Sequence, residues 1–290
     1  MKKYIGEIGL FLVAIIWGGG FVATRAALDG GLTTSQIMTL RFFLSALVMN
    51  IIFFKPIKEN FTPGLIKSGI ILGICLFAGF FLQTMGLNYT TPSKNAFLTS
   101  VNVVIVPFIG VVLYKRKIDK FGIISSFMAI IGIAILSLSA DFSVNKGDIL
   151  TLLCAFGFAF QIFFTSEFVK NQNPMALTAM QFTVAFVLSF IVQIFMGEVR
   201  LESTIGGYMG IVYLALFSTA LCFLLQTICS KMVDGTRVAI ILSTEAVFGT
   251  IFSIIILSEP ITARMIIGSI IIFASVITAE TKLSFLRKKA

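Results

Sequence analysis

Ten runs of about 20 mostly apolar residues follow one another along this chain of 290 residues. A helix of about 20 residues is long enough to cross the hydrocarbon core of a bilayer. Of all residues, 58% are hydrophobic and only 12% are charged, which is too little charge to cover the surface of a soluble domain. We therefore predict an all-α polytopic membrane protein with ten transmembrane helices and no separate soluble domain. The predicted spans are residues 5–27, 34–54, 67–87, 93–114, 119–139, 148–169, 176–197, 207–229, 238–257 and 261–280.

The basic residues are distributed unevenly between the two sides of the membrane. With the N-terminus inside, 16 of the 22 lysines and arginines lie in segments on that side, and only Lys94, Lys146, Arg200 and Arg264 lie on the other. Cytoplasmic loops of membrane proteins carry such an excess. We therefore predict a multi-pass protein of the cell membrane (the plasma or inner membrane of a bacterium) with both termini in the cytoplasm. The net charge of +9 then reports orientation and does not indicate a nucleic-acid partner.

The second half of the chain repeats the pattern of the first. Residues 79–84 (GFFLQT) resemble residues 222–227 (CFLLQT), and at the same offset of 143 Ser100 meets Ser243. We predict a first five-helix repeat over 1–140, a connecting loop over 141–146 and a second repeat over 147–290. Because five is odd, the second copy starts on the opposite side of the membrane. Inverted repeats of this kind are typical of secondary transporters, whose substrate site lies between the copies, so we expect a central cavity.

Several short motifs resemble a known family. Residues 17–21 (WGGGF), 40–42 (LRF) and 258–262 (SEPIT), followed by Gly268, are similar to the EamA type of the drug/metabolite transporter (DMT) superfamily, and the resemblance covers the whole chain. It implies two five-helix bundles around a central cavity and export of amino acids or related metabolites. The chain differs at residues 115–117 (KRK), where the first copy of this family often carries a glycine–glutamate pair.

Arg41 is a cation inside the second predicted span, about 10 Å from its start at 1.5 Å per residue. A cation at that depth costs at least about 2.5 kcal/mol unless it is hydrated or paired. It could anchor a substrate carboxylate, for which a guanidinium fork is suited. A structural role, in which it binds backbone carbonyls or helix dipoles, is the alternative. Its counterpart in the second half is the neutral Gln181.

Glu245 is an acid near the centre of the ninth predicted span, and its counterpart in the first half is Asn102. Loss of water around a carboxyl group favours its uncharged form, so Glu245 is a candidate for substrate binding and for proton coupling. A bond to Arg41 or to neighbouring hydroxyls, with no transport role, is the alternative. Asn102 is a candidate for substrate binding.

Four further residues are candidates for the cavity. The equivalent Gln83 and Gln226, and Gln161 near the middle of the sixth span, could bind substrate or hold helices together through amide hydrogen bonds. Trp17 is the only tryptophan and lies within its span beside three glycines, so it could form an aromatic wall. Those glycines allow either close helix packing or local unwinding.

Lys94 and Arg237 occupy equivalent positions at the starts of the fourth and ninth spans, on opposite sides of the membrane. They are candidate entrance charges that would guide anionic groups. Simple extension of both side chains to the lipid headgroups is the alternative.

The chain has no histidine, and its four cysteines form no close pair, so we expect no metal and no cofactor. The leading hypothesis is a secondary transporter that exports small organic metabolites, amino acids or related compounds, by alternating access. A facilitator that takes up a vitamin or a nucleobase-type metabolite and a non-transporting membrane enzyme are the alternatives. An enzyme would need clustered acids or histidines at the membrane surface, so we expect no enzymatic activity. The expected partners are a small-molecule substrate and the lipid bilayer, with the protein a monomer or a homodimer.

Overall fold

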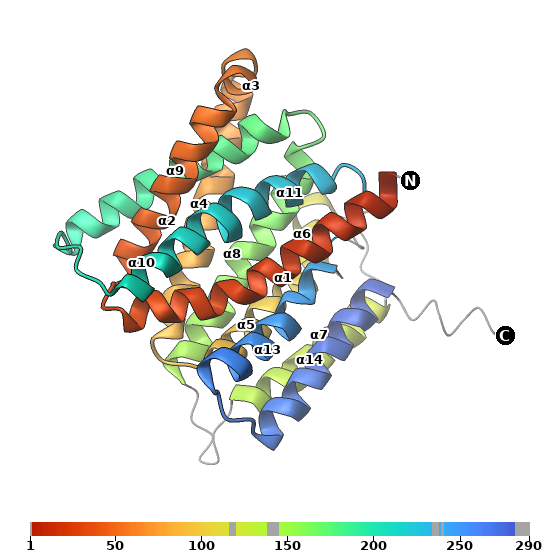
Figure 1. Cartoon of the computed structure of the whole chain (residues 1–290). Coiled ribbons are helices and arrows are strands. Elements are labelled where there is room, and N and C mark those ends of the chain that lie inside the picture. The colour runs from red at the N-terminus through yellow and green to blue at the C-terminus, as the bar shows by residue number, and fades with distance from the viewer. Residues whose placement is uncertain (1, 116–119, 138–144, 234–237, 239–240, 282–290) are drawn as a thin grey trace.

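The computed structural model describes residues 2–115, 120–137, 145–233, 238 and 241–281, and every regular element in these ranges is a helix (Figure 1). The elements are α1 (Lys2–Asp29), α2 (Thr34–Ile52), α3 (Phe54–Glu59), α4 (Pro63–Leu87), α5 (Pro92–Ser100), α6 (Asn102–Tyr114), α7 (Lys120–Ser137), α8 (Lys146–Phe168), α9 (Pro174–Phe195), α10 (Ile205–Val212), the π-helix η1 (Tyr213–Leu221), α11 (Cys222–Cys229), α13 (Glu245–Leu257) and α14 (Ala263–Thr281).

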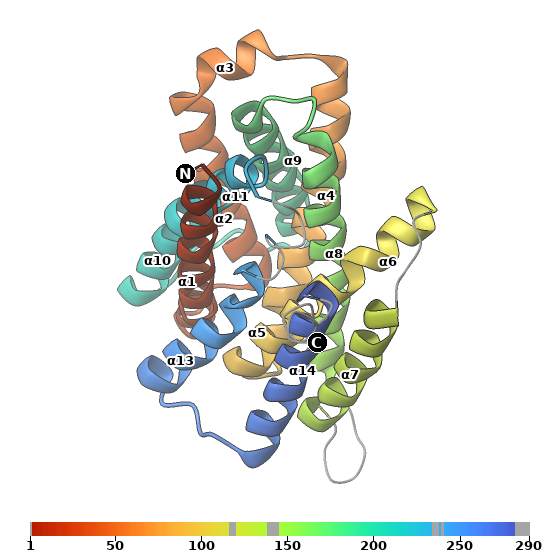
Figure 2. The same cartoon turned by 90° about the vertical axis from the view of Figure 1, so that its right-hand side faces the viewer.

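Within the described residues, seven segments are long and apolar enough to span a bilayer, and three shorter apolar helices complete a set of ten. The shorter ones are Ile123–Ile135, Ile241–Leu257 and Ala263–Ser275. Large apolar side chains cover the outside of the bundle; Phe195, for example, is 87% exposed. Lipid solvates such a surface and water does not, so the prediction of an all-α, ten-helix membrane protein is confirmed. The short α3, which joins α2 to α4 at one end of the bundle in Figure 2, was not predicted.

The two sets of five spans pack on each other with two-fold related contacts. Helix α4 packs on α8, and correspondingly the α10–η1–α11 span packs on α1. Helix α1 packs on α13 as α8 packs on α5 and α6. The equivalent helices α2 and α9 pack on each other, as do α7 and α14, and α5 packs on α13, which is the counterpart of α6. Figure 1 shows α7 and α14 side by side at one edge. Because each copy has an odd number of spans, the two copies are inverted repeats.

Both repeats interrupt their fourth span at the same place. Val101 separates α5 from α6, and its N–H bonds the Leu98 carbonyl while its own carbonyl accepts from Val104 N–H. At offset 143, Thr244 makes the equivalent bonds just before α13 begins. The same spans also end alike, because Lys115 (φ 53°) and Ser258 (φ 54°) both adopt the left-handed conformation. The duplication therefore extends to the details of the backbone.

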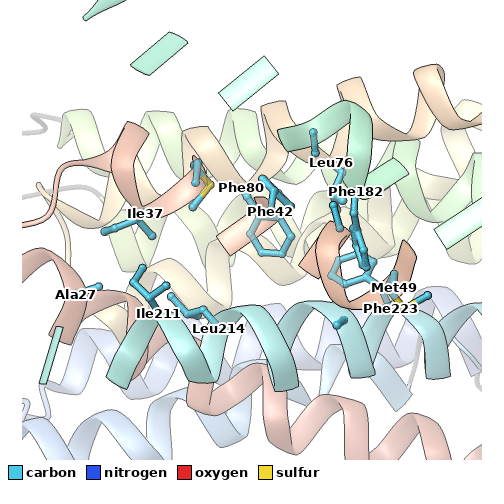
Figure 3. Packing of buried hydrophobic residues seen from close by; sticks show 14 of the residues in the cluster. Ala27, Ile37, Phe42, Met49, Leu76, Phe80, Phe182, Ile211, Leu214 and Phe223 are labelled. Carbon is cyan, nitrogen blue, oxygen red and sulfur yellow. The ribbon is translucent and has the colours of Figure 1, made fainter. Parts of the chain in front are cut away.

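Phenylalanines from both repeats form the centre of the largest core cluster (Figure 3). The Phe80 ring lies 5.8 Å from that of Phe223 and 5.9 Å from that of Phe42, measured between centroids. Phe182 lies 6.0 Å from Phe223. Since Phe42 and Phe80 belong to the first repeat and Phe182 and Phe223 to the second, this cluster holds the repeats together.

Glycines bring helix backbones into direct contact. A Cβ added at Gly157 of α8 would lie 2.8 Å from the backbone nitrogen of Gly79 in α4. A Cβ at Gly18 would lie 2.8 Å from the Gly249 nitrogen, while α1 stays helical through all three of its consecutive glycines. Of the two roles considered for those glycines, close helix packing is the one observed. Small residues allow such approach in membranes, where interhelical packing replaces the hydrophobic effect.

Replacing Gly157 with alanine should destabilise the protein. The new methyl group meets the α4 backbone, which cannot rotate away as a side chain can, so we expect a loss of about 1–3 kcal/mol, typical of overpacking. Gly206→Ala is the matched control, because its nearest neighbour would lie 3.8 Å away and alanine is the better helix former. Thermal unfolding in detergent compares the two. Equal melting temperatures for Gly157→Ala and the parent protein would contradict the packing described above.

Candidate functional site

A cavity lies between the repeats. Its walls come from helices of both halves: α1, α2, α4, α5, α6, α8, η1, α11 and α13. The lining residues are Trp17, Gly20, Phe21, Thr24, Arg41, Phe80, Gln83, Thr99, Asn102, Phe158, Gln161, Ile162, Leu214, Ser218, Phe223 and Glu245.

Much of this lining consists of equivalent residues from the two repeats. At offset 141, Trp17 corresponds to Phe158, and at offset 143, Phe80 corresponds to Phe223. Their contacts are equivalent too, because the Trp17 ring lies 5.1 Å from Phe223 and the Phe158 ring lies 4.8 Å from Phe80. The cavity is therefore built around the two-fold relation between the repeats, with aromatic walls on both sides.

Arg41 projects from α2 into this cavity and is 2% exposed. Its Nε donates to Thr219 Oγ1 at 2.5 Å and its Nη2 to Ser218 Oγ at 3.2 Å. The guanidinium carbon lies 3.7 Å from the centroid of the Phe80 ring, a cation–π contact. Within the described residues, no carboxylate lies within 4.0 Å of the guanidinium, and Nη1 makes no hydrogen bond. A buried cation with free N–H groups is well suited to an anionic ligand.

Glu245 and Asn102 lie at the start of α13 and α6, directly after the two equivalent interruptions. Both line the cavity; Glu245 is 8% exposed and Asn102 is 5% exposed. The described residues offer the Glu245 carboxylate neither a hydrogen bond nor an ion pair, and the buried Asn102 Oδ1 also has no partner among them. These acceptors are therefore available to a donor inside the cavity. The bond to Arg41 that was considered for Glu245 is not observed.

Two glutamines lie at the cavity with one partner each across a helix contact. Gln83 Nε2 donates to Thr99 Oγ1 at 3.1 Å. Gln161 Nε2 donates to Gln181 Oε1 at 3.2 Å, and also to Thr165 of its own helix at 3.0 Å. Gln181 is the counterpart of Arg41, so a neutral amide pair occupies the place that the cation occupies in the other half.

The remaining predicted residues lie elsewhere. Gln226 is buried but does not line the cavity, and its Oε1 has no partner among the described residues. Lys94 Nζ lies 2.7 Å from Oδ2 of the fully buried Asp148, whose other oxygen accepts from Thr90 Oγ1 at 2.7 Å. Lys94 is therefore held in an ion pair. Arg237 lies outside the described residues.

Sequence reasoning missed the hydroxyl partners of Arg41 and the phenylalanines of the cavity wall. Ser218 and Thr219 are small hydroxyl residues in an apolar span, and nothing in their pattern points to Arg41. Phe80 and Phe223 could have been found, because they occupy the same position in the two copies of the duplicated segment. Within the described ranges, no group of three or more histidine, cysteine, aspartate or glutamate residues could hold a metal ion.

Comparison with known proteins agrees with this architecture. The chain matches the EamA-like transporter family twice, over residues 4–138 and 145–280. It is 32% identical to an uncharacterized transporter of Archaeoglobus fulgidus, over 97% of this chain and 88% of the relative. It is 25% identical to the uncharacterized transporter YyaM of Bacillus subtilis, over 87% of this chain and 86% of that protein.

The fold also has a counterpart among solved structures. One crystal structure superimposes with a TM-score of 0.73 over 99% of both chains at 14% sequence identity, a likeness that concerns the fold alone. Both halves of the chain match the same family model, and each half supplies one side of the cavity. The protein is therefore a multi-pass membrane transporter with two copies of one repeat, and it belongs to the EamA-like transporter family.

Proposed function

We propose that this transporter exports a small zwitterionic metabolite, an amino acid or a related compound, by alternating access of the two repeats to the central cavity. The observation that carries the proposal is Arg41, a buried cation that lines the cavity with no carboxylate beside it among the described residues. Export is the direction that the family resemblance favours.

The present partners of Arg41 do not neutralise its charge, so an anion would stabilise it further. Two hydroxyls accept hydrogen bonds from the guanidinium and the Phe80 ring makes a cation–π contact with it, but all three partners are neutral. Removing a cation from water is costly unless it is paired with an anion. A ligand carboxylate could bind Nη1 and the second proton of Nη2, which the described residues leave free. This is a charge-assisted pair of the strong kind.

Glu245 and Asn102 complete the proposed site at the start of α13 and α6. Their free acceptor atoms suit the ammonium group of an amino acid, while Trp17 and the phenylalanine walls suit an apolar side chain. A single carboxyl group that gives up its proton on one side of the membrane and regains it on the other is also sufficient for coupling. We propose that Glu245 has both roles.

We further propose that the repeats comprise residues 1–140 and 147–290, joined by residues 141–146, with both termini in the cytoplasm. The support is the excess of basic residues on the side of the N-terminus. The protein would then place Lys146 outside and Lys55 inside.

Cysteine labelling tests this orientation. With the four native cysteines replaced, Lys146→Cys should react with a membrane-impermeant maleimide added to intact cells, because the exposed Lys146 starts α8, at the end of that helix that the proposed orientation puts outside. Lys55→Cys, also exposed, is the matched control and should react only in inside-out vesicles. Labelling of residue 146 from the cytoplasmic side alone would reverse the topology.

Replacing Arg41 with lysine tests the anchor. Lysine keeps the charge but loses the fork, so binding of an amino acid identified by a thermal-shift screen should weaken by roughly 1.5–3 kcal/mol, the worth of a charged hydrogen bond. Arg25→Lys is the matched control, because Arg25 forms a partly exposed pair with Asp29 at 3.0 Å. Equal affinity of the parent protein for the amino acid and its methyl ester would contradict the anchor. Loss of folding with unchanged affinity in the residual folded protein would indicate a structural role.

Replacing Glu245 with glutamine tests proton coupling. In proteoliposomes, Glu245→Gln should abolish accumulation driven by an imposed pH gradient, since glutamine cannot release a proton. It should leave solute exchange intact, because the glutamine side chain keeps an acceptor oxygen for the ammonium group. Glu59→Gln, at a position whose side chain is 60% exposed, should keep both activities. Normal pH-driven accumulation in Glu245→Gln would remove this residue from the mechanism. If the parent protein ignores the gradient, the protein is a facilitator.

A further inference from the structure

The eighth span contains a π-helix beside the cavity. Residues Tyr213–Leu221 form η1 between α10 and α11, whereas the equivalent residues 70–78 of the first repeat lie within the regular helix α4. π-helical turns are rare and are found preferentially at functional sites. The two otherwise equivalent spans therefore differ in this part, and in the second repeat it supplies Leu214 and Ser218 to the cavity wall.

The π-helix presents two consecutive hydroxyls to the same guanidinium. Thr219 Oγ1 accepts from Arg41 Nε at 2.5 Å, and Ser218 Oγ accepts from Nη2 at 3.2 Å. Consecutive residues of an α-helix are turned by about 100° from each other, and the wider π turn reduces that angle. This helix form therefore helps neighbouring side chains reach one group.

Other side chains of the first repeat also bind η1. The Trp17 Nε1 donates to the backbone carbonyl of Ser218 at 2.8 Å, and Ser45 Oγ donates to the Ala215 carbonyl at 2.8 Å. The Arg41 and Trp17 side chains, which line the cavity, are both held at residue 218 of the opposite repeat.

Thr219 is fully buried and is not a lining residue of the cavity. It therefore cannot contact a solute there, and its described side-chain bond is the one to Arg41. With Nε and one Nη2 proton held at the wall, Nη1 remains free of protein partners among the described residues.

We propose that Thr219, together with Ser218, is a positioning residue that fixes the Arg41 guanidinium so that its free N–H groups face the cavity. Thr219 acts through Arg41 and not on the solute. The proposal rests on the anchor role of Arg41 given above. It adds that Ser218 and Thr219 orient the guanidinium, and that the π-helical form of η1 allows both to reach it.

Trp17 provides a reporter that needs no identified solute, because it is the only tryptophan and it lines the cavity with Arg41. Quenching of its fluorescence by the iodide anion depends both on access to the ring and on positive charge nearby, whereas quenching by neutral acrylamide depends on access alone. The ratio of the two quenching constants therefore reports the charge. In the purified full-length protein, Thr219→Val should lower the ratio of the iodide to the acrylamide quenching constant by about twofold, since a fixed charge concentrates anions locally. Arg41→Gln should lower it at least as far.

Matched variants separate positioning from general damage. Thr219→Ser keeps the hydroxyl and should retain the parent ratio. Thr227→Val, the same substitution in the same span at a buried position that does not line the cavity, should also retain it. A merely structural defect would change quenching by both agents together. If Thr219→Val does not fold, Ser218→Ala decides, because it removes the longer of the two bonds and should give an intermediate ratio.

The outcomes distinguish this proposal from the one on which it rests. A ratio in Thr219→Val that equals or exceeds that of the parent, with a lowered ratio in Arg41→Gln, would overturn the positioning role alone. An unchanged ratio in Arg41→Gln would overturn the cavity charge, and both proposals with it. A Trp17 that neither agent quenches would also overturn both, because the cavity would then not open to water.

Discussion

The absence of water inside a bilayer is the constraint on which the whole structure depends. Every backbone N–H and C=O within a span must find its partner in the protein, which leaves the helix as the element for this chain. Exceptions need a reason: the interruptions at Val101 and Thr244 and the π-helix η1 all adjoin the central cavity. The same constraint applies to Arg41, whose guanidinium donates to two hydroxyls of the protein and lies against the ring of Phe80.

Duplication provides a symmetric scaffold, and a few substitutions make it chemically asymmetric. The aromatic contacts Trp17–Phe223 and Phe158–Phe80 are equivalent and neutral. The charges are not equivalent, because Arg41 has Gln181 as its counterpart and Glu245 has Asn102. Each repeat thus contributes one ionisable side chain to the cavity, and of the two neutral counterparts Asn102 lines the cavity whereas Gln181 does not. A cation and a carboxyl group in a cavity with aromatic walls match the two ends of a zwitterion, which is the physical basis of the proposed substrate class.

Bonds between the repeats also gather away from the cavity, at the end of the bundle where α4 leads into α5. Lys94 of the first repeat pairs with the buried Asp148 of the second, and Ser93 Oγ donates to Glu259 Oε2 at 2.8 Å. These contacts close that end around the starts of α5 and α8. The ion pair explains why Lys94 does not extend freely to the lipid headgroups: a buried carboxylate is costly to leave without a cation.

The sequence by itself determined the membrane class, the ten spans and the duplication, because span length and residue order are properties of the chain alone. It also identified Trp17, Arg41, Gln83, Asn102, Gln161 and Glu245 as polar or aromatic residues in apolar surroundings, and all six line the cavity. Only the tertiary structure separated Gln83, at the cavity, from its counterpart Gln226, buried elsewhere. It alone brought Thr219 to Arg41, 178 residues away, and paired Lys94 with Asp148. Those contacts depend on helix rotation and on how the repeats dock, which are decided by packing between distant segments and leave no periodic pattern in the chain.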